Sequence, residues 1–96
     1  MDRKKPEQLG DVLRSVLEEQ GVSERLKEVR AALLWPAIVG EDIAGQTSRP
    51  IVNVGVMTIK VYSASLRHEL AMSRSVLKRL LNEAVGEDVI SDIRFH

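Results

Sequence analysis

Residues 50–81 constrain the fold most, because two strand-like stretches there run directly into a long amphipathic helix. Residues 51–53 and 56–62 are rich in β-branched side chains and flank Gly55, a pattern typical of a β-hairpin. Every second position of the latter stretch is apolar, which predicts one buried face formed by Met57, Ile59 and Val61.

The sequence predicts one continuous helix after the hairpin. Ser63 or Ser65 can cap its first turn, and Gly86 stands where a C-terminal cap is expected. Its apolar residues fall on one stripe, which we expect to cover the buried face of the hairpin: Leu66, Leu70, Leu77, Leu80, Leu81 and Ala84.

Two further helices are predicted before the hairpin. The first follows Pro6 and ends at Gly21, and its apolar face consists of Leu9, Val12, Leu13, Val16 and Leu17. The second begins after Ser23, and its apolar face consists of Leu26, Val29, Leu33 and Leu34. We expect Pro36 to interrupt this second helix and Gly40 to end the segment.

The remaining segments complete a single domain. Residues 41–49 are polar and read as a loop anchored by Ile43 and Ala44, and residues 89–95 read as a third strand. The predicted order is α-α-β-β-α-β, a small α+β domain over residues 1–96 with a three-stranded sheet covered on one face by helices. Residues 1–6 are expected to be frayed. The predicted core includes Trp35, Leu66, Leu70 and Leu77.

Composition argues for a cytoplasmic, soluble chain. The sequence has no Cys, no apolar run long enough for a membrane span, and no apolar stretch after its first basic residues of the kind a signal peptide needs. Fourteen basic and fourteen acidic residues give zero net charge, so a nucleic-acid site would need a local arrangement of cations.

The sequence offers little for catalysis. His68 and His96 are the two histidines, and His68 lies opposite the leucine stripe, where it should face solvent. There is no Walker-type glycine loop, no dinucleotide fingerprint and no set of metal ligands. We therefore predict neither an enzyme nor a cofactor or small-molecule substrate; a pocket holding His68 beside a carboxylate would revive the enzyme hypothesis.

A line of cations does stand out on the predicted long helix. Arg67, Arg74 and Lys78 are spaced by seven and four residues and share one side of it, with Arg79 and Lys60 as outer candidates. Such a line could follow a phosphodiester backbone, although solvated helix faces commonly carry Lys and Arg without any ligand.

Four apolar residues are candidates for either the core or a surface that binds a partner. Trp35 fits a core anchor whose indole N–H is bonded nearby, or else an exposed partner-binding residue. Tyr62, Met72 and Val76 lie off the centre of the stripe and could form an exposed apolar margin that docks a partner.

An ordered series of residues resembles the domain of the bacterial DciA family. The series runs Trp35, Ile38-Val39-Gly40, Ile43-Ala44, Thr47, Pro50, Gly55, Met57, Ile59, Val61, Ser63 and Glu69-Leu70. The resemblance implies a type II KH-like fold with a mixed sheet. It also implies a role in DNA replication, with the replicative helicase as partner and single-stranded or forked DNA as a further ligand.

The sequence departs from that family in two informative ways. Leu66 stands where the family usually has an aromatic residue, and no G-x-x-G loop of the RNA-binding KH type occurs. The leading hypothesis is a non-enzymatic accessory protein that assists helicase loading. The alternative is a protein-interaction module, monomeric or dimeric, that binds no nucleic acid.

Overall fold

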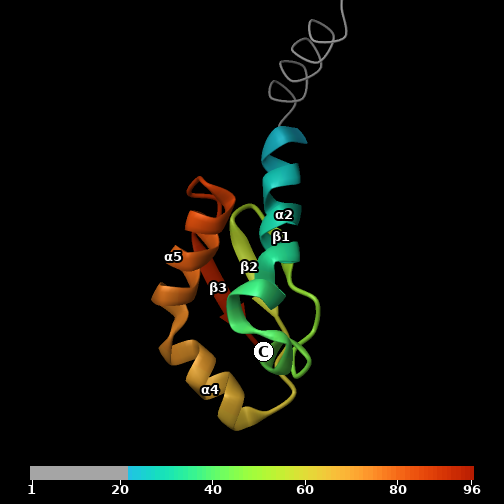
Figure 1. Ribbon diagram of the computed structural model, residues 1–96, viewed down its shortest axis with the longest axis vertical. Coiled ribbons are helices and arrows are strands. Elements are labelled where there is room, and N and C mark those ends of the chain that lie inside the picture. Colours follow the sequence, from blue (N-terminus) through green and yellow to red (C-terminus); the bar gives the residue numbers. More distant parts are fainter. Residues whose placement is uncertain (1–21) are drawn as a thin grey trace, which may run out of the picture.

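A small mixed sheet forms the centre of the domain in the computed structural model, which describes residues 22–96 (Figure 1). Its strands are β1 (Ile51–Asn53), β2 (Val56–Ile59) and β3 (Asp92–Phe95), in the order β1-β2-β3. β1 pairs antiparallel with β2, whereas β2 and β3 run parallel. The mixed sheet implied by the family resemblance is confirmed.

Four helices accompany the sheet in the described part of the chain. They are α2 (Val22–Val39), α3 (Glu41–Ala44), α4 (Ala64–Met72) and α5 (Arg74–Val85). Figure 1 shows α2 and α5 alongside each other, with α4 continuing from the lower end of α5. The helix predicted for residues 6–20 lies outside the described residues.

One face of the sheet is buried and the other is exposed, as the alternation predicted. Met57, Ile59 and Ile93 are fully buried, whereas the neighbouring Thr58 and Arg94 point outward and are exposed. Met57 lies opposite Ile93 in the parallel pair, so these side chains form the floor on which the helices pack. The sheet is therefore covered by helices on one face.

Trp35 anchors α2 to the rest of the core. Its side chain is buried, its ring lies 6.3 Å from the ring of Phe95, and its Nε1 donates a hydrogen bond of 3.1 Å to Oγ1 of Thr47. The Thr47 hydroxyl in turn donates to the carbonyl of Ala44 at 2.9 Å. The core-anchor reading of Trp35 is confirmed, and the partner-binding reading is wrong.

The prediction that Pro36 interrupts the second helix is wrong, because α2 continues through Pro36 to Val39. The carbonyl of Pro36 accepts the N–H of Gly40 at 2.8 Å, and Gly40 then ends the helix with φ of 91°. A proline inside a helix costs about 3 kcal/mol. Burial of Trp35, directly before it, is the interaction that offsets this cost.

The apolar face predicted for α2 is wrong in orientation for three of its four residues. Leu26, Val29 and Leu33 are exposed, whereas Leu34 is half-buried against the core that Ala31 and Trp35 face. A large aromatic side chain with a buried hydrogen bond outweighs three aliphatic ones in setting the rotation of the helix.

The single long helix predicted after the hairpin is instead two helices joined at Ser73. Ser73 has φ of −99° and ψ of 12°, well away from helical ψ. A serine side chain can hydrogen-bond to nearby backbone groups and so competes with the hydrogen bonds of the helix. Helices often kink where such residues lie close together, as Ser73 and Ser75 do here. The predicted caps are confirmed. Ser63 Oγ accepts the N–H of Leu66 at the start of α4, and Gly86 caps the end of α5 in the left-handed conformation.

The bend does not disturb the leucine stripe. Leu70 on α4 and Leu77 and Leu81 on α5 are buried, and Leu66 is half-buried against them. Ala84, the last predicted member of the stripe, is exposed.

Two smaller segments differ from prediction. The predicted loop 41–49 begins with the one-turn helix α3, and the strands are shorter than expected, since β2 ends at Ile59 and β3 begins at Asp92. Val61 instead forms an isolated antiparallel bridge with Thr47.

The hairpin turn contains a residue in an unfavourable conformation. Val54 and Gly55 form a two-residue loop in which both φ angles are positive, 48° and 79°. Hairpins with this geometry favour Asn-Gly, and a β-branched residue at positive φ is strained. Val54 is 86% exposed, so it gains little burial in return.

Replacing Val54 by Asn should therefore stabilise the domain by about 1 kcal/mol, because Asn tolerates the left-handed region. The melting temperature should rise by about 4–8 °C in thermal unfolding followed by circular dichroism. The matched substitution Ile51→Asn, at an exposed strand position with extended backbone, should give no such gain. A lower melting temperature for Val54→Asn would contradict the turn geometry.

The Trp35–Thr47 hydrogen bond gives a second test. Thr47→Val keeps the side-chain shape but leaves the buried indole N–H without its acceptor, which should cost about 1–3 kcal/mol in urea unfolding. Thr47→Ser, which keeps the hydroxyl, should lose less. Equal losses for the two variants would show that the methyl group, and not the hydrogen bond, matters at this position.

Candidate functional site

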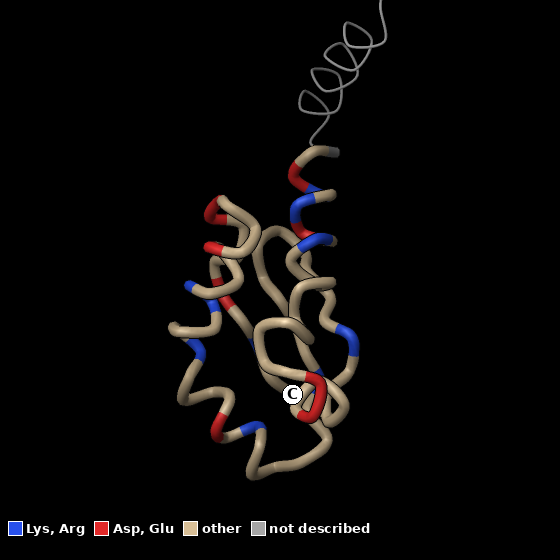
Figure 2. The backbone as a smooth tube through the Cα atoms, viewed as in Figure 1, with Lys and Arg blue, Asp and Glu red and all other residues tan. Residues whose placement is uncertain are grey.

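Basic residues lie along α4 and α5 with acidic residues between them, and others lie on α2 (Figure 2). Arg74 and Lys78 lie one turn apart on α5 and line a common hollow of about 310 Å³. The hollow also includes Met72 from the end of α4, Ser91 from the loop before β3 and Asp92 from the start of β3. We call this the α5 hollow.

Arg67 lies apart from this pair, because the bend at Ser73 separates α4 from α5. Its Nη2 donates to the carbonyl of Val61 at 3.3 Å, and its Nε is buried with no hydrogen-bond partner within residues 22–96. The Arg67 side chain thus helps to fix the segment that leads from β2 into α4, and it is only half-exposed.

The two outer candidates have different surroundings. Arg79 is exposed and forms an ion pair with Glu83 at 3.3 Å, one turn further along α5. Lys60 projects from the end of β2, where its backbone N–H and carbonyl are both bonded to Ser48. The structure brings Arg74 and Lys78 together in the α5 hollow. Arg79 instead shares a second hollow with Lys78, and Arg67 and Lys60 lie at separate positions.

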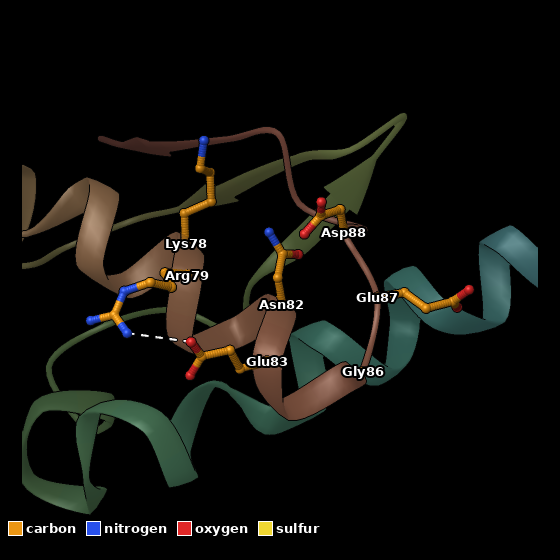
Figure 3. Close-up of a pocket in the computed structure, with 7 residues that line it drawn as sticks. All are labelled: Lys78, Arg79, Asn82, Glu83, Gly86, Glu87 and Asp88. Atoms are coloured by element: carbon orange, nitrogen blue, oxygen red, sulfur yellow. Dashed lines mark hydrogen bonds and ion pairs between the residues drawn. The ribbon is translucent and has the colours of Figure 1, made fainter.

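A larger hollow of about 530 Å³ lies at the C-terminal end of α5 (Figure 3). Lys78 and Arg79 line it together with three acidic residues, Glu83, Glu87 and Asp88. Acidic side chains therefore outnumber basic ones here, and the mixed charge does not favour an anionic ligand.

Asn82 holds the loop that closes this larger hollow. Its Oδ1 accepts the N–H groups of Val89 and Ile90 at 2.9 and 2.8 Å, and its Nδ2 donates to the carbonyl of Ile90 at 2.9 Å. The side chain is buried, and Figure 3 shows it pointing from α5 toward the loop. No periodicity in the sequence marked Asn82, because its role depends on a loop seven residues further along.

Lys27 ties α2 to the same loop. Its Nζ lies 2.8 Å from a carboxylate oxygen of Glu87 and 3.0 Å from one of Glu24. Hydrogen bonds to Glu87 and then to Glu24 raise the pKa of Lys27 above its usual value. Because both carboxylates are exposed, the contact links two surfaces without adding much stability.

An exposed apolar side chain lines the α5 hollow. This is Met72, which is 75% exposed; Val76 and Tyr62 are exposed as well, but neither of them lines the hollow. Met72 lines the hollow beside Arg74 and Lys78, so an unbranched, adaptable side chain lies next to two cations. An apolar group flanked by positive charge is suited to a partner that is itself partly apolar and acidic.

The described residues show no sign of a metal centre or a membrane segment. Within residues 22–96, no three His, Cys, Asp or Glu side chains come together in a way that could hold a metal ion. In the same range no helix is long and apolar enough to cross a membrane. His68 is exposed on α4, as its position relative to the leucine stripe predicted.

A family comparison decides where this domain belongs. The model of the family described as "Dna[CI] antecedent, DciA" matches residues 8–95. The chain belongs to the DciA family. The match includes every described helix and strand and begins within the segment that precedes α2.

Curated relatives agree with this assignment. A protein of Mycolicibacterium smegmatis named "UPF0232 protein in recF-gyrB intergenic region" is 29% identical over 93 residues, which cover 97% of this chain and 48% of the relative. A UPF0232 protein of Mycobacterium tuberculosis is 28% identical over the same length, covering 97% and 50%. The chain thus spans about half the length of the curated relatives that it matches.

Truncating Asn82 tests the loop that borders the larger hollow. Asn82→Ala leaves two backbone N–H groups and one carbonyl without their partner, so the free energy of unfolding should fall by at least about 2 kcal/mol. Chemical denaturation measures this loss, and Glu83→Ala, at the exposed neighbouring position, serves as control with a change of less than about 0.5 kcal/mol. Wild-type stability of Asn82→Ala would contradict the proposed role of the amide.

Proposed function

We propose that this protein is a non-enzymatic accessory of bacterial DNA replication, which binds the replicative helicase and contacts single-stranded or forked DNA during helicase loading. Membership of the DciA family is the observation that carries this proposal, because the match extends over residues 8–95. The KH-like classification of the fold and a cytoplasmic location are parts of the same proposal.

The α5 hollow is the surface that supports the proposal best. Arg74 and Lys78 can each approach one phosphate, since residues one turn apart on a helix lie about 6 Å from each other. Met72 beside them offers apolar contact for a protein partner. Arg67, Arg79 and Lys60 remain proposed outer contacts, with Arg79 needing to leave Glu83 first.

The mechanism would rest on binding energy alone. The domain would hold the helicase in the conformation that admits DNA, which requires it to bind that conformation more tightly than the closed one. A tenfold preference corresponds to about 1.4 kcal/mol, which one or two well-placed contacts can provide. Nucleotide hydrolysis would be left to the helicase.

Binding to a labelled single-stranded oligonucleotide at several salt concentrations tests the DNA contact. The double variant Arg74→Ala/Lys78→Ala should bind more weakly at low salt. Its slope of log affinity against log salt should be shallower by about 1.4, since each phosphate contact contributes about 0.7. Arg67 is left unchanged because its guanidinium also bonds Val61.

The matched control removes two exposed cations elsewhere, Arg30→Ala/Arg49→Ala, which changes the net charge equally. This control should keep a slope close to that of the wild type. A wild-type slope for the α5 variant, or an equal change in the control, would contradict the assignment of phosphate contacts to Arg74 and Lys78.

A protein-interaction module without DNA binding is the second candidate function. It is favoured by the zero net charge of the chain and by the pairing of Arg79 and Lys27 with glutamates. An oligonucleotide titration without binding at low salt, in the presence and absence of helicase, would select this candidate.

A further inference from the structure

A groove with apolar walls runs between α2 and β1, which lie side by side in Figure 1. One hollow of about 220 Å³ lies between Val29 and Leu33 on α2 and Pro50 and Ile51, where β1 begins. A second hollow of about 260 Å³ shares Leu33 and Pro50 with the first, so the two adjoin and form one groove. Ala32 lines both hollows, and its small side chain leaves the space between the walls open.

Both walls of this groove carry exposed apolar side chains. Leu33 is 69% exposed and Ile51 is 66% exposed, and Leu26 and Val29, on the same side of α2 as Leu33, are exposed as well. Exposed apolar side chains gathered on two neighbouring elements usually mark the place where another molecule binds. The groove shares no lining residue with the α5 hollow, so it offers a separate binding surface.

The exposed charges around the groove are positive. Arg25 and Arg49 line it, and Arg25 stays 55% exposed although it pairs with Glu28 at 3.4 Å. Glu28 lines the groove as well, but its side chain is only 12% exposed and its carboxylate accepts a backbone N–H of the hairpin turn at 2.7 Å. Arg30 is exposed one turn after Leu26 on the outer flank of α2. A ligand in the groove would therefore meet apolar walls with cations at the rim.

We propose that the groove between α2 and β1 binds an amphipathic helix of a partner protein, with apolar residues on its inner face and Asp or Glu along its edges. Leu26 and Leu33 lie about 10 Å apart along α2, so a partner helix of about three turns is long enough to follow them. Its apolar side chains would enter the groove at the spacing typical of a helix that binds in an apolar groove. Its carboxylates would pair with Arg25, Arg30 and Arg49.

The charge of the groove argues against two other occupants. In a two-fold dimer the same surface of both copies meets, which would bring Arg25, Arg30 and Arg49 of each copy to one interface. Like charges brought together in this way disfavour association. A phosphodiester backbone would pair with the arginines but would leave the apolar side chains of Leu33 and Ile51 without a partner. An acidic amphipathic helix matches both the walls and the rim.

Two synthetic peptides test the proposal on the full chain. The first is a helix of about 15 residues, held by a hydrocarbon staple, with leucines on one face and glutamates beside them. The second has lysines in place of the glutamates. Fluorescence polarisation of the labelled peptides should show that the acidic one binds more tightly by about tenfold or more, because its carboxylates complement the arginines. Leu33→Ser should weaken its binding by about tenfold, because a buried leucine contact is lost.

Met72→Ser is the matched control, since it removes a similarly exposed apolar side chain that does not line the groove, and it should leave the affinity unchanged. Arg49→Glu should weaken the acidic peptide and strengthen the lysine peptide.

Absence of binding by the acidic peptide, equal affinities of the two peptides, or equal effects of Leu33→Ser and Met72→Ser would overturn the proposal. Sedimentation of the protein alone would overturn it as well if it revealed a dimer that Leu33→Ser dissociates, because a second copy would then fill the groove. Displacement of the acidic peptide by an oligonucleotide would assign the groove to nucleic acid instead.

Discussion

The parallel pairing of β2 with β3 is the constraint on which the rest of the structure depends. Parallel neighbours cannot be joined by a tight turn, so the chain must cross from the end of β2 to the start of β3 through a long connection. α4 and α5 form that connection, and their leucines cover the same sheet face that Met57, Ile59 and Ile93 present. The loop before β3 is then fixed by Asn82, whose amide satisfies three backbone groups at once.

α2 depends on the same core through one residue. Trp35 packs near Phe95 on β3 and donates a hydrogen bond to Thr47 in the loop before β1. These two contacts hold the C-terminal half of the helix. The N-terminal half is held by Arg25 and Glu28, which bond to the backbone of Val52 and Gly55 in the hairpin. These two attachments set the rotation of α2, and they leave Leu26, Val29 and Leu33 facing outward.

The sequence predicted the elements that local patterns determine and missed those that depend on packing partners. Alternation in residues 56–62 identified the buried face of the hairpin, and Ser63, Gly40 and Gly86 marked helix ends. The rotation of α2 could not be read from periodicity, since both of its sides are apolar and the contacts of Trp35, Arg25 and Glu28 with distant residues decide between them. The bend at Ser73 was equally hidden, because the leucine stripe continues through it unchanged. For the candidate site, the sequence placed Arg67 in line with Arg74 and Lys78, whereas the bend and the bond to Val61 set it apart.

The account of function rests on a surface where an adaptable apolar side chain, Met72, lies beside Arg74 and Lys78 at the junction of α4 and α5. The measurement that tests this most directly is a titration of isotope-labelled protein with the replicative helicase, followed residue by residue by NMR. Signals of Met72, Arg74 and Lys78 should broaden first, at helicase concentrations that leave the exposed sheet residues Thr58 and Arg94 sharp. A spectrum that the helicase does not change, or broadening confined to the sheet face, would contradict it.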